Sequence, residues 1–584
     1  MPCMNKEAFF ADTAEDYVIP PEPEEKEAVR FRFRTLKDDA ERVDYVIAGG
    51  EPARMNHVFS DTRFDYYEIT VNAGTGRLSY CFRITSGQEV LYYDTMGPSE
   101  GHDDDYNFCV IPGFHVPEWT KGCVMYQILV DRFRNGNTEN DVREGEYIYL
   151  KKPVHHVGNM DERPAALDVG NFHGGDLRGI LDKLDYLKSL GVGALYLNPV
   201  FKSPSNHKYD VEDYDCIDPH IAEGDDPNAF FSYFVKCCHD KGIRVILDGV
   251  FNHCSDRNRL AEQKDREYWW DNLTLPKFNY ERRPELKGKI LEIAGKWMKP
   301  PYEADGWRLD VAADLGHSRQ YNHEFWRDFR RTVKEAGKDR FILAEHYGDP
   351  REWLSGKEWD SVMNYDGFMD PLSFFLTGME KHSDYYDGTR RGDGWRFETE
   401  VRRAMSRMNG PSVLCAMNEL DNHDHSRFLT RTNRTAGRLP AASSEEADTN
   451  TDRRILMQAA VIQMTLPGAP TIYYGDEAGV CGWTDPDSRR AFPWGKEDTE
   501  LQEFYRALAA FHNAHECIRK GSLIWLRSEW DFVSYARVYG EDYIIAAVNT
   551  SDEEKEIRIP SWKCSPKEND RQIRIAPHGY YYSE

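Results

Sequence analysis

The pattern of hydrophobic and polar positions changes twice along the chain and divides it into three parts. In the first part the two kinds of residue alternate, as in residues 29–34 (VRFRFR), 66–71 and 78–84. Alternation with period two, interrupted by turn residues, is typical of half-buried antiparallel strands. We therefore predict a leader and a small β-sandwich over residues 1–117, and we expect the leader to be an extended, exposed arm.

In the second part, short buried strands alternate with amphipathic helices. Eight units in this order predict an α/β fold, a (β/α)8 TIM barrel over residues 118–515, with a short B-type insertion at about 254–285. An open doubly wound sheet is the alternative, but the Gly-rich phosphate turn expected of it is missing. The predicted strands cover residues 124–129, 194–197, 243–247, 307–309, 341–344, 361–363, 412–415 and 471–473.

The third part returns to alternation, in residues 532–537 and 543–548, and predicts a C-terminal β-sandwich over residues 516–584. The net charge of the chain is −26, which argues against nucleic acid or an anionic membrane surface as a partner. The 12 cysteines form no CxxC pair, and we interpret them as reduced thiols. With neither a signal peptide nor a long apolar run in view, we expect a cytoplasmic protein.

Acidic residues recur where the predicted barrel strands end. Asp248 ends the third strand, Asp310 the fourth and Glu345 the fifth, and Asp424 follows the seventh. Catalytic groups of such barrels lie at the C-terminal ends of the strands. Each residue alone could be a helix cap or half of a structural ion pair, but that alternative does not predict their recurrence at one face.

Two carboxyl groups with different roles suit glycoside hydrolysis. Arg308 lies two residues before Asp310, so in a strand both side chains point to the same face, and the guanidinium should keep Asp310 ionised. One carboxylate then attacks the sugar or stabilises its positive charge, while a second carboxyl with a raised pKa protonates the leaving oxygen. Neighbouring histidines and Arg308 would bind sugar hydroxyl groups.

The sequence closely resembles the α-amylase superfamily of glycoside hydrolases, and within it the neopullulanase, cyclomaltodextrinase and maltogenic amylase group. The resemblance implies that Asp310 is the nucleophile, Glu345 the acid/base and Asp424 the stabiliser of the transition state. It implies substrate contacts from His207, Tyr209, Asp248, Asn252, His253, Arg308 and His423. The motifs that carry it are SPSNHKYD (203–210), DGVFNH (248–253), LPKFN (275–279), GWRLD (306–310), Glu345, His423-Asp424 and the stretch 468–477.

A second group of oxygen-bearing side chains lies at residues 131–141 and is followed by Gly174-Gly175-Asp176. Such residues at tight spacing suit Ca²⁺. The resemblance implies a structural calcium site; the alternative is a polar turn in which Asp176 caps a helix. The implied ligands are Asn135, Asn137, Asn140, Asp141, the carbonyl of Gly174 and Asp176.

The resemblance implies a retaining hydrolase of α-1,4 bonds in maltooligosaccharides, cyclodextrins, or pullulan and starch fragments, with α-1,6 bonds left open. A transglycosylase or an α-1,6 debranching enzyme on the same scaffold is the alternative. A non-catalytic sugar-binding protein is disfavoured, because the carboxylates and adjacent histidines are all retained. The short segment 254–279, the missing Trp two residues after Glu345 and the extra acids Glu419 and Asp421 leave substrate preference open. The N-terminal sandwich resembles a starch-binding-type module, which could equally well form a homodimer.

Overall fold

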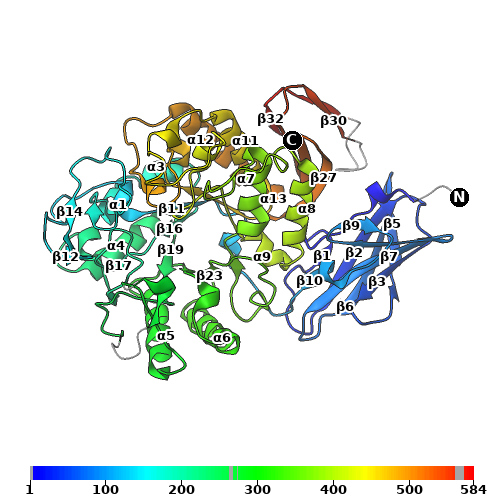
Figure 1. The fold of residues 1–584 in the computed structure, drawn as a ribbon. Coiled ribbons are helices and arrows are strands. Elements are labelled where there is room, and N and C mark those ends of the chain that lie inside the picture. Colours follow the sequence, from blue (N-terminus) through cyan, green and yellow to red (C-terminus); the bar gives the residue numbers. More distant parts are fainter. Residues whose placement is uncertain (1–3, 262–266, 273, 560–570, 584) are drawn as a thin grey trace.

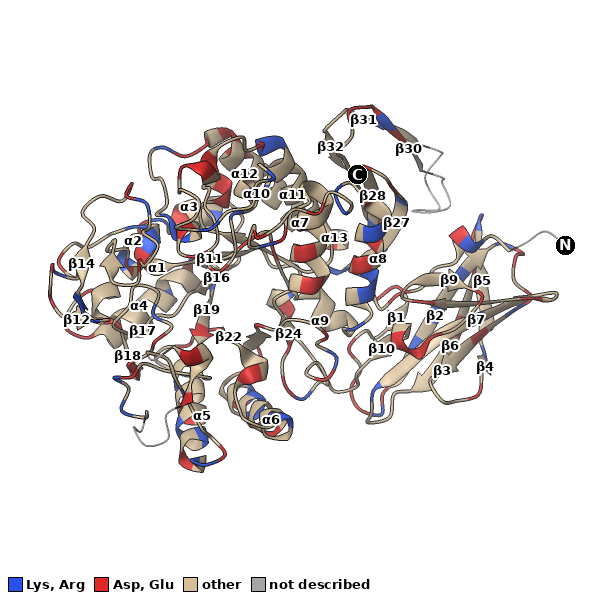
Figure 2. Ribbon diagram, in the orientation of Figure 1, with Lys and Arg blue, Asp and Glu red and all other residues tan. Residues whose placement is uncertain are grey.

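The computed structural model describes residues 4–261, 267–272, 274–559 and 571–583. Figure 1 shows the α/β domain on the left, the N-terminal β domain on the right and the C-terminal strands at the top between them. Acidic and basic residues are spread over all three parts (Figure 2). No helix among the described residues combines the length and the apolar character that a membrane span requires.

Eight parallel strands form the central sheet in the order β24-β23-β22-β19-β16-β11-β26-β25. A parallel bridge between Met363 and Met417 joins the two outer strands, so the sheet closes and the predicted (β/α)8 barrel is confirmed. The strands are β11 (Met125–Ile128), β16 (Ala194–Leu197), β19 (Arg244–Gly249), β22 (Gly306–Leu309), β23 (Phe341–Ala344), β24 (Ser361–Val362), β25 (Met417–Glu419) and β26 (Ala469–Tyr473).

The predicted position of the seventh strand is wrong. Residues 410–414 form the short helix α9 (Gly410–Leu414), and the strand β25 begins only at Met417. Asn409 caps the helix by accepting a hydrogen bond from the backbone N–H of Ser412, and Pro411 stands in its first turn. These local signals favour a helix, and a short apolar run such as 412–415 does not by itself distinguish a helix from a strand.

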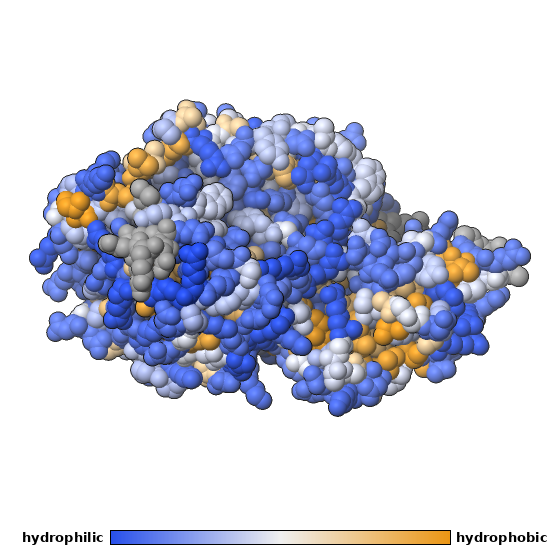
Figure 3. Space-filling model, turned by 60° about the horizontal axis from the view of Figure 1, so that its bottom comes forward, coloured by the Kyte–Doolittle hydropathy of each residue, from blue (hydrophilic) through white to orange (hydrophobic). Residues whose placement is uncertain are grey.

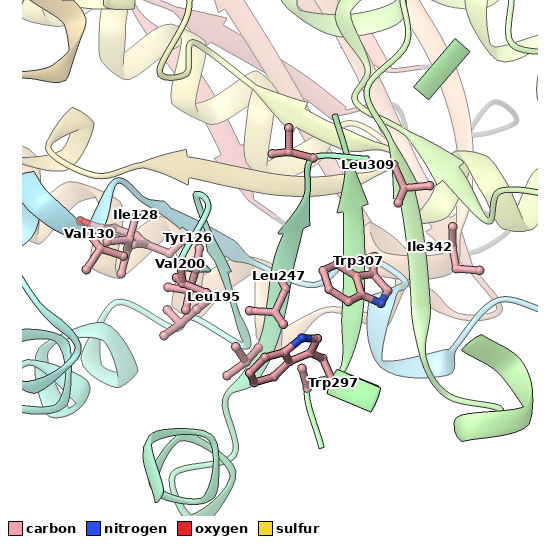
Figure 4. Close-up of a cluster of buried hydrophobic side chains, with 14 of the residues drawn as sticks. Tyr126, Ile128, Val130, Leu195, Val200, Leu247, Trp297, Trp307, Leu309 and Ile342 are labelled. Atoms are coloured by element: carbon pink, nitrogen blue, oxygen red, sulfur yellow. The ribbon is translucent and has the colours of Figure 1, made fainter. Parts of the chain in front are cut away.

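Amphipathic helices cover the outside of the barrel. Trp307 on β22 lies between the sheet and helix α5; it is fully buried, and its indole N–H donates to the carbonyl of Ala294 (Figure 4). Burying such a side chain contributes a few kcal/mol, which holds the strand that ends at Asp310 in place. The longer helices are α4 (Pro227–Asp240), α5 (Pro284–Met298), α6 (Arg319–Ala336), α7 (Asp370–Thr377), α8 (Gly394–Met405), α11 (Arg453–Thr465) and α12 (Thr499–Ala514).

The N-terminal domain consists of two antiparallel sheets with an aromatic core between them, where Phe31 packs against Tyr80 and Phe33 against Phe82. One sheet has the order β1-β2-β6-β5 and the other β4-β3-β7-β8-β9 with β10 beside β7. Their bounds are β1 (Val18–Ile19), β2 (Ala28–Leu36), β3 (Arg42–Ile47), β4 (Ala53–Arg54), β5 (Asn56–Ser60), β6 (Phe64–Asn72), β7 (Leu78–Ser86), β8 (Glu89–Asp94), β9 (Gly97–Ser99) and β10 (Phe108–Val110).

The leader is not an exposed arm, in contrast to the prediction. Phe9, Phe10 and Tyr17 are buried, and β1 pairs with β2. The Pro/Glu run that suggested an extended arm covers only residues 20–25, whereas the apolar residues before it join the core of the domain. Figure 3 shows a mostly hydrophilic face on which hydrophobic residues gather toward the N-terminal domain.

The C-terminal domain is an antiparallel β structure, as predicted. Its larger sheet has the order β27-β28-β29-β32, and β30 pairs with β31. The bounds are β27 (Ser522–Glu529), β28 (Phe532–Tyr539), β29 (Asp542–Asn549), β30 (Lys555–Ile559), β31 (Arg571–Ile575) and β32 (Tyr580–Ser583).

Candidate active site

Arg308 lies among three carboxyl groups at the C-terminal edge of the barrel. Its Nη1 donates to Oδ1 of Asp310 at 2.9 Å and to Oδ1 of Asp248 at 3.0 Å. Its Nη2 lies 3.0 Å from Oε2 of Glu345, as an ion pair that lacks hydrogen-bond geometry. β19, β22 and β23 are neighbours in the barrel, and their register places Asp248 directly beside Arg308. The structure therefore brings Asp310 and Glu345 together around one guanidinium.

The backbone turns sharply after Asp310. Val311 has φ +37° and ψ +48°, in the left-handed region, which is unfavourable for a β-branched residue. The N–H of Val311 donates to Oε2 of Glu345 at 2.8 Å. Strained backbone of this kind persists only where its surroundings fix it, and it is concentrated at functional sites. The hydrogen bond from Val311 thus links the ends of β22 and β23 and holds one oxygen of Glu345.

The pKa values of Asp310 and Glu345 are both raised. Burial raises the pKa of both carboxyl groups above their ordinary values; Arg308 opposes the increase, and neighbouring carboxylates add to it. The expectation that Arg308 simply keeps Asp310 ionised is therefore incomplete, because Asp248 and Glu345 share the same guanidinium. Two close carboxyl groups in one buried site retain a proton between them. Of these two carboxyl groups, Asp310 receives a hydrogen bond from Arg308 and Glu345 receives one from the backbone N–H of Val311.

Neutral rings surround the pair. The rings of Tyr209 and His423 stack with centroids 5.1 Å apart and planes 6° apart. Burial lowers the pKa of His423, and it lowers the pKa of both His253 and His207 to about 3, so all three imidazoles are neutral near pH 7. Nε2 of His253 lies 4.0 Å from Oδ2 of Asp310. Such rings suit a neutral ligand with hydroxyl groups, as a sugar is.

The tautomer of His423 follows from its neighbours. Nε2 of Gln127 lies 2.9 Å from Nδ1 of His423, so the amide N–H donates and the ring proton is on the other nitrogen. That nitrogen, Nε2, lies 3.3 Å from Oδ2 of Asp424. Asp424 also accepts a hydrogen bond from Nη2 of Arg489 at 3.0 Å. Its side chain keeps 37% of its surface exposed, so Asp424 stands at the mouth of the site.

Two residues predicted to contact substrate, Asp248 and Asn252, are almost fully buried. Both carboxylate oxygens of Asp248 are occupied, by Arg308 and by the hydroxyl groups of Tyr196 and Tyr209, each 2.7 Å away. Asn252 is fully buried, and its Nδ2 lies 3.2 Å from Nδ1 of His253. In the structure they position Arg308, Tyr209 and His253, and their contact with substrate stays a prediction.

Several residues of the site could not be identified from the sequence pattern. Tyr196 and Gln127 point inward from β16 and β11, and their inward direction follows only from the closed barrel. Arg489 comes from a loop 65 residues after Asp424. Glu419, noted only as an extra acid, is buried at the end of β25, and its Oε2 accepts a hydrogen bond from Asn422. Burial raises the pKa of Glu419 to about 8.

The predicted calcium ligands also come together. Nδ2 of Asn135 donates to Oδ1 of Asp141 at 2.7 Å, and a Cβ on Gly174 would lie 2.4 Å from that same oxygen. The Oδ1 atoms of Asn135 and Asn140 are buried without a hydrogen-bond partner. Buried oxygens of this kind are costly unless something binds them, and hard oxygen ligands are what Ca²⁺ takes.

Asp176 also fulfils the alternative interpretation, because its carboxylate caps helix α2 (Leu177–Leu181). The same carboxylate accepts from the N–H groups of Gly136 and Asn137, and burial raises its pKa to about 6. Among the described residues no cluster of three or more His, Cys, Asp or Glu side chains is arranged to hold a metal ion. The amides and the carbonyl of Gly174 must therefore supply much of any coordination, and these residues fit Ca²⁺ better than a transition metal.

Comparison with known proteins agrees with this geometry. The family profile "Alpha amylase, catalytic domain" matches residues 127–271 and 260–529, and "Alpha amylase, N-terminal ig-like domain" matches residues 4–114. The chain is 33% identical to a cyclomaltodextrinase of Thermoanaerobacter pseudethanolicus, over 95% of this chain and 94% of the relative. It is 32% identical to neopullulanase 2 of Thermoactinomyces vulgaris, over 95% and 92%. A solved cyclomaltodextrinase structure, 27% identical, superposes with a TM-score of 0.71 over 99% of this chain and 100% of that chain.

Proposed function

This chain belongs to the α-amylase family of glycoside hydrolases, and from that membership we propose that it is a retaining hydrolase of α-glucans. The substrates we propose are maltooligosaccharides, cyclodextrins and fragments of pullulan or starch, cleaved at α-1,4 bonds. The relatives named cyclomaltodextrinase and neopullulanase support this substrate class. The observation that carries the chemistry is the Arg308 guanidinium, which holds Asp310 by a hydrogen bond and lies 3.0 Å from Glu345.

In the first step, a carboxylate oxygen of Asp310 attacks the anomeric carbon of the sugar. The bond from that carbon to the glycosidic oxygen breaks, and Glu345 transfers its proton to the leaving oxygen. The product of this step is a glycosyl ester on Asp310. The neutral imidazoles of His253 and His423 and the ring of Tyr209 hold the sugar, and Asp424 binds hydroxyl groups that shift in the transition state.

In the second step, the Glu345 carboxylate takes a proton from a water molecule whose oxygen attacks the same carbon. The ester bond to Asp310 breaks, and the two inversions leave the anomeric configuration unchanged. Transfer to a sugar hydroxyl instead of water would make the enzyme a transglycosylase. Among the residues that the structure describes, no contact in the site favours that outcome or α-1,6 debranching over hydrolysis.

We further propose that Ca²⁺ binds to Asn135, Asn137, Asn140, Asp141, Asp176 and the Gly174 carbonyl and stabilises the loop after β11.

We also propose that the protein is cytoplasmic, since the ten cysteines among the described residues are free thiols. A homodimer through the N-terminal domain is supported by Val58 and Phe59, which are exposed on the edge strand β5. Whether that domain binds starch is tested by sedimentation of the protein with insoluble starch.

Replacement of Asp310 by Asn tests the proposed function. We expect Asp310→Asn to lower turnover of maltotriose at least about 10⁴-fold, because an amide does not form the glycosyl ester. Asp314→Asn is the matched control, since Asp314 is exposed four residues further on, and it should keep wild-type activity. Activity of Asp310→Asn close to that of the wild type would refute the assignment, provided that both variants melt at the same temperature.

A further inference from the structure

Glu419 is a buried carboxyl group that the proposed mechanism does not use. It ends strand β25, two residues after Met417. Met417 belongs, with Ile246 and Leu343 from other strands, to the hydrophobic cluster inside the barrel. Successive side chains of a strand point to opposite faces, so Glu419 points inward as Met417 does. Glu419 therefore lies inside the barrel at the edge that carries the active site.

The side chain of Asn422 joins Glu419 to the loop that carries Asp424. Its Nδ2 donates to Oε2 of Glu419 at 3.0 Å and to the hydroxyl group of Tyr365 at 3.1 Å. Its Oδ1 accepts from the backbone N–H of Asp424 at 3.0 Å and from Nδ1 of His425 at 2.7 Å. Because an amide NH₂ only donates and an amide oxygen only accepts, the acceptor on Glu419 fixes which way round the Asn422 amide stands.

We propose that Glu419 is a positioning residue: its un-ionised carboxyl group holds the amide of Asn422, and that amide holds the backbone that presents Asp424. The inference rests on the proposed function, in which Asp424 binds hydroxyl groups that shift in the transition state. Without the acceptor on Glu419 the amide is free to rotate, and the N–H of Asp424 loses its partner. The loss then falls on kcat more than on KM, because Asp424 acts in the transition state.

The surroundings of Glu419 suit the un-ionised acid. Its Oε1 is buried, and among the described residues it has no hydrogen-bond partner. A buried oxygen without a partner costs far more free energy on a carboxylate than on a carboxylic acid. The guanidinium of Arg308 already contacts three other carboxyl groups. In keeping with this geometry, burial raises the pKa of Glu419 to about 8.

Ionisation of Glu419 adds a negative charge beside the catalytic groups. Such a charge raises the proton affinity of Glu345 and competes with it for Arg308, so the acid gives up its proton less readily. As the pH rises through about 8, kcat should therefore fall in the wild type. The ionisable groups whose charges act on Glu419 lie on four elements: Arg308 on β22, Glu345 after β23, Tyr365 after β24 and Asp421 in its own loop.

The test is the pH dependence of kcat for maltotriose in the wild type and in Glu419→Gln. The amide of this variant has the shape of the un-ionised acid, accepts the same hydrogen bond from Asn422 and does not ionise. We expect the ratio of kcat, variant over wild type, to rise about three- to tenfold from about pH 6 to about pH 9, because most of Glu419 is ionised above its pKa of about 8. Ionisation of Glu345 itself affects both proteins and is largely removed by taking the ratio.

Glu419→Leu tests the hydrogen bond itself. The leucine side chain accepts no hydrogen bond from Asn422, so kcat at about pH 6 should fall about 10- to 100-fold, with a smaller change in KM. Glu419→Gln should restore most of this loss. Glu358→Gln is the matched control, because Glu358 is an equally buried carboxyl group that pairs with His323 and Arg327 outside the barrel. Its kcat ratio to the wild type should not depend on pH.

The two hypotheses fail in different ways. If the wild type does not hydrolyse maltotriose, the proposed function is wrong and this inference falls with it. If the wild type is active but the kcat ratio of Glu419→Gln is the same at both pH values, only the role of Glu419 is overturned. Wild-type kcat in Glu419→Leu would overturn it equally. Should Glu419→Leu not fold, as thermal unfolding would reveal, the ratio measured with Glu419→Gln decides alone.

Discussion

At the scale of single residues, Arg308 is the centre of the site, because its guanidinium contacts three buried carboxyl groups at once. The planar fork reaches Asp248 and Asp310 from Nη1 and Glu345 from Nη2. The ammonium group of a lysine is a single point with no such fork. The positive charge of Arg308 alone therefore does not explain the site. The planar shape of its guanidinium also sets where Asp310 and Glu345 lie relative to each other.

We predict that Arg308→Lys lowers kcat about 10²- to 10³-fold and destabilises the fold by about 1–3 kcal/mol, because one carboxyl loses its partner. Arg330→Lys is a suitable control, since Arg330 pairs with Asp360 on the outside of the barrel. Steady-state kinetics and urea unfolding measure the two effects. Unchanged kcat with a raised KM would show that Arg308 merely binds substrate.

Glu419 gives a prediction with a defined pH window. Its pKa is raised by burial from 4.5 to about 8, so the folded protein keeps a proton there that the unfolded chain releases. The free energy of unfolding therefore falls as the pH rises from 4.5 toward 8. We predict that Glu419→Gln, which is not titratable, stabilises the protein by up to about 3 kcal/mol at pH 7 and has little effect at about pH 4.5.

Thermal unfolding of the wild type and Glu419→Gln at about pH 5 and about pH 8 measures the difference. Glu51→Gln, at an exposed position of the N-terminal domain, controls for loss of a charge alone. An equal effect of Glu419→Gln at both pH values would mean that the residue is already ionised in the fold.

Site residues that directly follow a barrel strand could be predicted from the sequence. Contacts that form only when the barrel closes could not. Asp310, Glu345 and Asp424 were identified because each follows a barrel strand. The occupied oxygens of Asp248 could not be foreseen, because Tyr196 and Tyr209 reach it only through the closed barrel. The strained backbone at Val311 likewise depends on Glu345 from the next strand.

Among elements, strands with strong patterns were predicted well and short ones poorly. β16 and β23 lie where the sequence predicts them, because each is a clear run of four buried residues. The seventh strand was misplaced because β25 is only three residues long and follows a capped helix with a similar apolar pattern. The predicted insertion at 254–285 includes residues 262–266 and 273, which lie outside the described residues; β20 (Glu267–Tyr268) and β21 (Pro276–Lys277) form a small hairpin within it.

The loop after β11 carries the calcium prediction. We expect chelation to lower the melting temperature by a few degrees and Ca²⁺, but not Mg²⁺, to restore it, because Mg²⁺ demands near-ideal octahedral geometry and keeps several of its waters, whereas Ca²⁺ accepts a flexible set of six protein oxygens. Asn135→Ala should abolish this response, while Asn159→Ala, in an exposed turn, should retain it. Melting that is insensitive to chelation in metal-free protein would contradict the proposal.

At the scale of the whole molecule, the sequence predicts all three domains but not the contacts between them. The buried leader and the core that the N-terminal domain shares with Ile524, Phe532 and Ile545 of the C-terminal domain depend on contacts between distant segments. The N-terminal and C-terminal domains therefore share one hydrophobic core.

The central claim is that Asp310 forms a covalent intermediate and the configuration is retained. Proton NMR of the fresh products of maltotriose hydrolysis tests it most directly, before the sugar anomers equilibrate. The account predicts that the new reducing end appears first as the α-anomer and that the β-anomer grows in only later. Initial release of the β-anomer would mean direct attack by water and would contradict a nucleophilic role for Asp310.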